Sequence, residues 1–86
     1  MSIKPKDVLP DEQNEACIEG VTVRKGTVAA VLANLDLLDS PHTSPEAKAA
    51  ALETIREFVP ALVALGFRKH LRFNDPRVQA MLDQLL

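Results

Sequence analysis

The residues with the clearest chemical potential are Arg24, Lys25, Gly26 and Thr27. Before Gly26 the chain alternates as a strand does, and after it the apolar residues recur with the period of a helix. A helix N-terminus exposes unpaired N–H groups and a partial positive charge, which suit a phosphate or a carboxylate. These four residues therefore form a candidate anion-contact site. A turn followed by a helix cap is the simpler interpretation, because the glycine spacing of a phosphate-binding loop is missing.

A second cationic group occurs in residues 67–73, which alternate and predict a strand with Arg68, His70 and Arg72 on one face. If this strand pairs with residues 21–24, Arg24 joins a basic patch that could contact an anionic partner or ligand. Nucleic acid is the alternative partner, because clustered Lys and Arg bind its backbone. The net charge of −2 and the absence of Trp and Tyr argue against nucleic acid.

Catalytic and metal-ligating groups are scarce. Cys17 with His70 is the only cysteine–histidine combination to consider, and it requires the two predicted strands to be neighbours. We expect Cys17 to be a small buried hydrophobic residue instead. His42 and His70 lack the spacing of a helical ligand pair, and Glu53 and Glu57 fit a solvated helix face. The sequence thus predicts a protein that is not an enzyme and has no cofactor or metal site.

The size of the chain points to self-association. At 86 residues it forms one domain at most, and a core of this size is marginal. Cys17 is the only cysteine, so no internal disulfide is possible. Several apolar residues lie beyond the helical stripes and suggest a second buried surface: Leu37, Val63, Leu65, Leu85 and Leu86. We therefore expect a homodimer, with another protein as a possible further partner.

The predicted elements are about three helices on a very small two- or three-stranded sheet, an α+β fold that dimerisation would complete. Residues 16–24 read as strand, with Glu19-Gly20 as either a hairpin turn or a bulge. A helix follows from Thr27, the expected N-cap, to about Asp39. Its apolar stripe is Val28, Val31, Leu32, Leu35 and Leu38.

The second helix is predicted to start at Ser44-Pro45 and to run to about Leu65, with Gly66 ending it. Pro60 lies inside it, so we expect either a kinked helix or two helices broken near Phe58. Its apolar stripe is Ala51, Leu52, Ile55, Phe58, Val59 and Leu62. Asp75-Pro76 predicts the start of a last helix with Val78, Met81, Leu82 and Leu85 on its apolar face.

The domain prediction is an extended acidic arm over residues 1–15 and a single small α+β domain over residues 16–86. Five acids and no base lie between residues 7 and 19: Asp7, Asp11, Glu12, Glu15 and Glu19. The arm either lies across the basic strand, held mainly by Ile3, Val8 and Leu9, or is disordered. No apolar run has the length of a signal peptide or a membrane span, so we expect a cytoplasmic protein without membrane contact.

Overall fold

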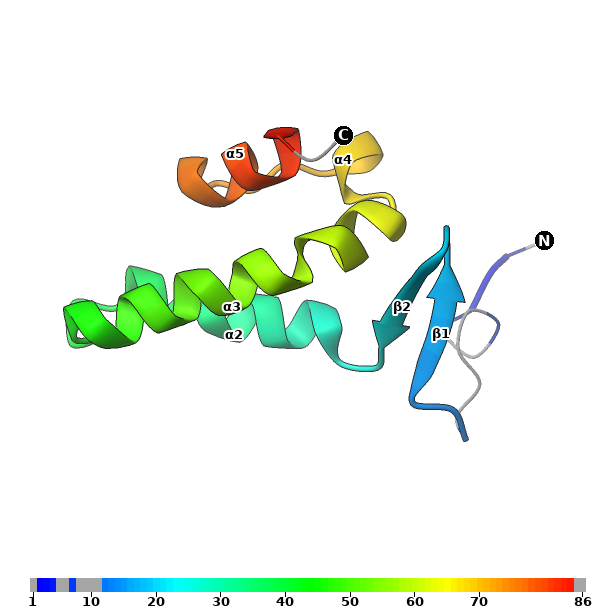
Figure 1. The fold of residues 1–86 in the computed structure, drawn as a ribbon, viewed down its shortest axis with the longest axis horizontal. Helices are drawn as coiled ribbons and strands as arrows, with labels where there is room; N and C mark the ends of the chain where they lie inside the picture. The colour runs from blue at the N-terminus through cyan, green and yellow to red at the C-terminus, as the bar shows by residue number, and fades with distance from the viewer. Residues whose placement is uncertain (1, 5–6, 8–11, 85–86) are drawn as a thin grey trace.

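The computed structural model describes residues 2–4, 7 and 12–84 as a β-hairpin followed by helices (Figure 1). The described elements are β1 (Glu15–Ile18), β2 (Val21–Arg24), α2 (Thr27–Asp39), α3 (Pro45–Ala64), α4 (Phe67–His70) and α5 (Pro76–Gln84). The general α+β prediction is confirmed. The helix count differs slightly, because the described residues contain four helices where about three were expected.

The hairpin settles the alternatives for residues 16–24. β1 and β2 are antiparallel, with Ala16 opposite Val23 and Ile18 opposite Val21. Glu19 and Gly20 both have positive φ, 50° and 77°, as a two-residue hairpin turn of type I′ requires. The segment is therefore two strands joined by a tight turn.

The start of α2 differs from the prediction. Gly26, at φ 87°, is the N-cap, and Thr27 is the first helical residue. The Thr27 hydroxyl donates to the carbonyl oxygen of Arg24 (2.7 Å), and no side-chain hydrogen bond caps the first turn. The expectation that Thr27 caps the helix is wrong, because its buried side chain is directed back at the strand. The predicted end at Asp39 is confirmed.

α3 begins as predicted. The Ser44 hydroxyl accepts from the N–H of Ala47 (3.1 Å), and Pro45 is the first helical residue. The helix continues through Pro60 without interruption. Pro60 is exposed at the surface of this single helix. The alternative of two helices broken near Phe58 is therefore excluded.

α3 is the centre of the core and lies between α2 and α5 (Figure 1). The buried cluster comes from all three helices: Val31, Leu38, Ala51, Ile55, Val59, Leu62, Val78, Met81 and Leu82. The apolar stripe predicted for α3 is confirmed. The stripe of α2 is only partly buried, because Val28 and Leu32 are exposed.

The predicted strand over residues 67–73 is wrong. Gly66 adopts a left-handed φ of 97°, and its carbonyl accepts from Lys69 (3.0 Å) and His70 (3.2 Å). These bonds form the single-turn helix α4. The chain then extends over residues 71–73, and the Phe73 ring stacks on that of Phe67 with centroids 5.8 Å apart. The described sheet consequently has two strands, both in the hairpin.

The N-terminal arm is described only in part. Ile3 is exposed, and Asp7 accepts through Oδ2 from the N–H of Lys4 (2.9 Å). Several residues named in the sequence predictions lie outside the described part of the chain: Val8, Leu9, Asp11, Leu85 and Leu86. The arm was expected to lie across a basic strand. That strand does not form, since residues 67–70 are helical.

Candidate functional site

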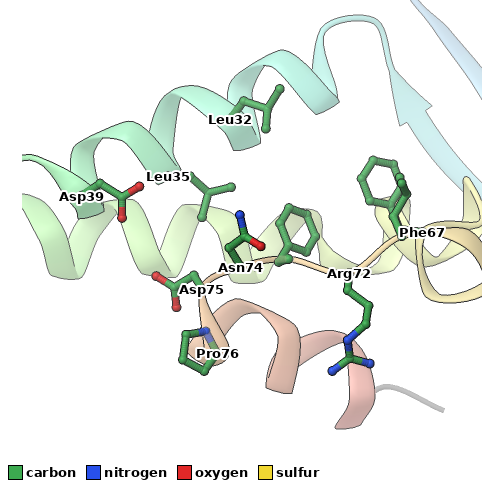
Figure 2. Close-up of a pocket in the computed structure, with 10 residues that line it drawn as sticks. Leu32, Leu35, Asp39, Phe67, Arg72, Asn74, Asp75 and Pro76 are labelled. Carbon is green, nitrogen blue, oxygen red and sulfur yellow. The ribbon is translucent and has the colours of Figure 1, made fainter.

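An open groove of about 530 Å³ lies between two walls of the described chain (Figure 2). α2 provides the first wall with Leu32, Leu35 and Asp39. The chain from α4 to the start of α5 provides the second wall: Phe67, Leu71, Arg72, Phe73, Asn74, Asp75 and Pro76. The groove thus brings together segments that are far apart in sequence.

The lining of the groove is mainly apolar, and two of its leucine side chains are exposed to solvent. Leu32 is 53% exposed on the first wall and Leu71 is 54% exposed on the second. Val28 lies one turn before Leu32 on α2 and is also exposed. Exposed apolar surface rimmed by polar residues is typical of an interaction site. This groove is therefore the strongest candidate for a functional surface in the described residues.

The second wall is held in place by Gln79 of α5. Its Oε1 accepts from the backbone N–H of Phe73 (2.7 Å), and its Nε2 donates to Oδ1 of Asp83 (3.0 Å). Residues 71–73 belong to no described strand, so this side chain takes the place of a strand partner for Phe73. Gln79 is buried. It positions the groove without lining it.

Asp75 and Arg77 form an ion pair at the start of α5. The Asp75 carboxylate accepts from the Arg77 N–H (2.9 Å) and from its Nη2 (2.9 Å). The hydrogen bond from the Arg77 side chain is the main reason that the pKa of Asp75 is lowered. The same bond raises the pKa of Arg77, and attraction to Asp39 adds to it. Asp75 therefore serves mainly to cap α5, whereas Asp39 is an exposed acid on the groove.

The first predicted anion-contact residues lie at the junction of β2 and α2, where Arg24, Lys25 and Gly26 are exposed and Thr27 is buried. Arg24 pairs with Glu15 across the hairpin (3.7 Å), and the N–H of Lys25 donates to the carbonyl of Asn14 (2.6 Å). Thr27 is buried, with its hydroxyl bonded to the strand. Arg24 and Thr27 line a smaller hollow of about 290 Å³ between β2 and α3. Backbone groups and the Thr27 hydroxyl thus join the hairpin to α2, while the Arg24 side chain stays 79% exposed.

The second predicted group is dispersed. The Arg68 guanidinium donates from Nε (3.2 Å) and Nη2 (2.8 Å) to the carbonyl oxygen of Leu82. His70 and Lys69 are exposed on α4 and line another hollow, of about 430 Å³, beside the hairpin. Arg72 is the predicted site residue that lines the groove. The expected meeting of Arg24 with Arg68 and Arg72 on one sheet is wrong, since the required strand does not exist.

The candidate catalytic pair also loses its basis. Cys17 is exposed on β1, opposite Thr22, so the expectation that it is buried is wrong. A pair with His70 required two neighbouring strands, and His70 is in a helix. In the described part of the chain, no cluster of three His, Cys, Asp or Glu side chains is placed to hold a metal ion. None of the described helices is long and apolar enough to cross a membrane.

Sequence reasoning missed the groove because its walls meet only in the folded chain. The signal that existed was the apolar stripe of α2, of which Leu32 is a member. Comparison with protein-family models, with curated proteins and with solved structures finds no match to this chain. The function is therefore argued from the groove.

Proposed function

We propose that this chain is a non-enzymatic interaction module that self-associates through the groove between α2 and residues 71–76. One observation carries the proposal: Leu32 and Leu71, each more than half exposed, line the same apolar groove from opposite walls. Covering them removes apolar surface from water, which favours association. A chain of 86 residues without a disulfide gains stability from such cover.

The polar groups around the groove support a protein partner over a small-molecule substrate. Small-molecule sites usually combine an apolar lining with a few convergent polar groups. Here Asp75 is already bonded to Arg77, and Gln79 is already bonded to Phe73. Among the described residues, no buried side-chain N or O atom lacks a hydrogen-bond partner. The exposed polar groups left to orient a partner are Asp39, Arg72 and Asn74.

Arg72 keeps the proposed contact with an anionic group, now as part of the groove. The nucleic-acid alternative has less support, because arginines elsewhere in the described chain form intramolecular contacts: Arg24 with Glu15, Arg56 with Glu53, Arg68 with Leu82 and Arg77 with Asp75. Binding to a phosphate backbone depends on clustered cations and weakens steeply with salt. Weak, salt-insensitive retention on a nucleic-acid column would agree with a protein-binding role.

Sedimentation equilibrium from micromolar to millimolar concentration tests the proposal, with detection at the peptide bond because the chain lacks Trp and Tyr. The wild-type mass should rise with concentration, and Leu32→Ser or Leu71→Ser should abolish the rise. Leu37→Ser is the matched control, since Leu37 is 45% exposed on α2 but does not line the groove. A wild-type chain that stays monomeric throughout, or equal disruption by Leu37→Ser, would overturn the proposal.

A further inference from the structure

The charged side chains are distributed unequally along the groove, with acids at one end and a base toward the other. Figure 2 shows Asp39 and Asp75 at one end of the groove and Arg72 toward the other end, with the Arg72 guanidinium directed away from α2. Asp75 is held by Arg77, so Asp39 is the exposed acid at its end. Arg72 is exposed on the opposite wall. An occupant that fits must therefore present a cation near Asp39 and an anion near Arg72.

The charges along α2 follow the same order, with acids at its C-terminal end. Its last turn contains Asp36 and Asp39 and no base, and its first turn contains no acid. Arg24 and Lys25 lie just before the helix. Acids at a helix C-terminus oppose the helix dipole and are unfavourable there. Arg77 offsets part of this unfavourable charge, because its guanidinium is attracted to Asp39, an attraction that helps to raise the pKa of Arg77. The same guanidinium is, however, hydrogen-bonded to Asp75. A further cation near Asp39 would stabilise this end of α2.

We propose that the groove is occupied by a second copy of this chain, related by a two-fold axis that sets the two α2 helices antiparallel. This inference rests on the proposed function and names its partner and orientation. The two-fold axis brings Arg72 of each copy against Asp39 of the other, so the favourable pair forms twice. A parallel arrangement would bring Asp39 near its own counterpart and Arg72 near its own, which is unfavourable.

The apolar residues supply the affinity in this arrangement. Val28 and Leu32 form a ridge on α2, and the ridge of one copy enters the groove of the other beside Leu71. Solvent-exposed ion pairs contribute little affinity and mainly select the orientation. The chemistry of a second copy matches each requirement of the groove: an apolar ridge, a cation toward Asp39 and an acid toward Arg72.

Charge reversal tests the orientation. Arg72→Glu and Asp39→Lys should each weaken the homodimer about tenfold or more, because symmetry creates the repulsive pair twice. Mixing the two variants should restore association. In the heterodimer, one contact pairs the two substituted side chains, which have opposite charges. The other contact pairs the native Asp39 with the native Arg72. Native mass spectrometry distinguishes heterodimer from homodimers once one variant is isotope-labelled. Arg56→Glu changes the same charge on α3, outside the groove lining, and should leave wild-type affinity.

The outcomes separate the two proposals. Preferred heterodimer formation in the mixture supports the antiparallel arrangement. A wild-type dimer that requires Leu32 and Leu71, combined with a mixture no tighter than either variant alone, would overturn the orientation and leave the proposed function intact. A wild-type chain that does not associate at all would overturn both. Far-ultraviolet circular dichroism on each variant confirms that the comparison is made between folded chains.

Discussion

The guanidinium of Arg68 donates two hydrogen bonds to one oxygen, the carbonyl of Leu82, over 3.2 and 2.8 Å. This contact ties the short helix α4 to the C-terminal half of α5, fourteen residues further along the chain. The carbonyls in the last turn of a helix have no intrahelical partner, and a cation there also interacts favourably with the helix dipole. Arg68 thus stabilises the fold behind the second wall of the groove.

Replacing Arg68 should therefore destabilise the protein. Arg68→Ala should lower the free energy of unfolding by about 1.5 kcal/mol, in the range for hydrogen bonds that involve a charged group. Lys69→Ala is the neighbouring control, and since Lys69 is exposed its effect should stay within about 0.5 kcal/mol. Urea denaturation followed by circular dichroism measures both. Equal effects of the two variants would contradict the structural role of Arg68.

Gln79 should be sensitive to the loss of its amide. Gln79→Leu removes the acceptor for the Phe73 N–H and the donor to Asp83, and should cost about 1–3 kcal/mol of folding free energy. It should also weaken self-association, because residues 71–73 form a wall of the groove. Thermal melts and sedimentation measure the two effects.

Two related variants sharpen that test. Gln79→Glu keeps an acceptor for Phe73 but places a second carboxylate beside Asp83, so its cost should shrink when the carboxylates are protonated. Gln84→Leu at the exposed end of α5 should change stability little. If Gln79→Leu were as stable as Gln84→Leu, the bond to Phe73 would have no structural importance.

Stability should fall in acid through Asp75. Its pKa is lowered in the folded chain, mainly by the hydrogen bond from Arg77, relative to the ordinary value of 3.8. The folded state therefore binds a proton at Asp75 less readily than the unfolded state does. The resulting stabilisation is complete above the ordinary carboxyl pKa and is lost as the pH falls through the lower folded value.

Variants at this pair should flatten the pH dependence. In melts between about pH 2 and about pH 7, Asp75→Asn and Arg77→Ala should each reduce the loss of melting temperature below about pH 4. Arg72→Ala should retain the wild-type slope in that range, because Arg72 is not among the causes of the lowered pKa. An unchanged slope in both Asp75→Asn and Arg77→Ala would show that other acids govern acid denaturation.

Gly26 should tolerate asparagine better than alanine. Its φ is 87°, and a Cβ there would meet no atom within 4 Å, so the cost of a side chain comes from the backbone alone. Gly26→Ala should destabilise by about 1 kcal/mol, whereas Asn visits this region more readily and is a good N-cap. Chemical denaturation of the two variants makes the comparison. Equal stabilities would indicate that the turn relaxes to a negative φ.

The local signals in the sequence predicted much of the fold. Ser44 and Pro45 define the start of α3, and Gly66 follows its end, because capping and left-handed glycine act within a few residues. The alternation of residues 67–73 was misleading. Its outcome depends on Phe67 stacking on Phe73 and on Arg68 reaching Leu82, and neither contact can be read from a period of two.

The candidate site was less predictable. The helical period correctly places Leu32 on the apolar stripe of α2, but the period does not tell whether another element covers that residue. Leu71 falls within the strand predicted over residues 67–73, and instead it follows α4 on a segment that α5 supports through Gln79. Arg72 was named for its charge, and its position across the groove from Asp39 follows only from the folded chain.

Gly66 also has a consequence for engineering. This left-handed residue lies between the end of α3 and the start of α4, and an added Cβ would meet only the His70 ring, at 3.5 Å. The direction of the chain after α3 thus depends on the backbone dihedral angles of Leu65 and Gly66. A library of short insertions at this joint would vary the width of the groove and leave the residues that line it unmutated. Such a library would tune the proposed self-association without any change in the contact surface.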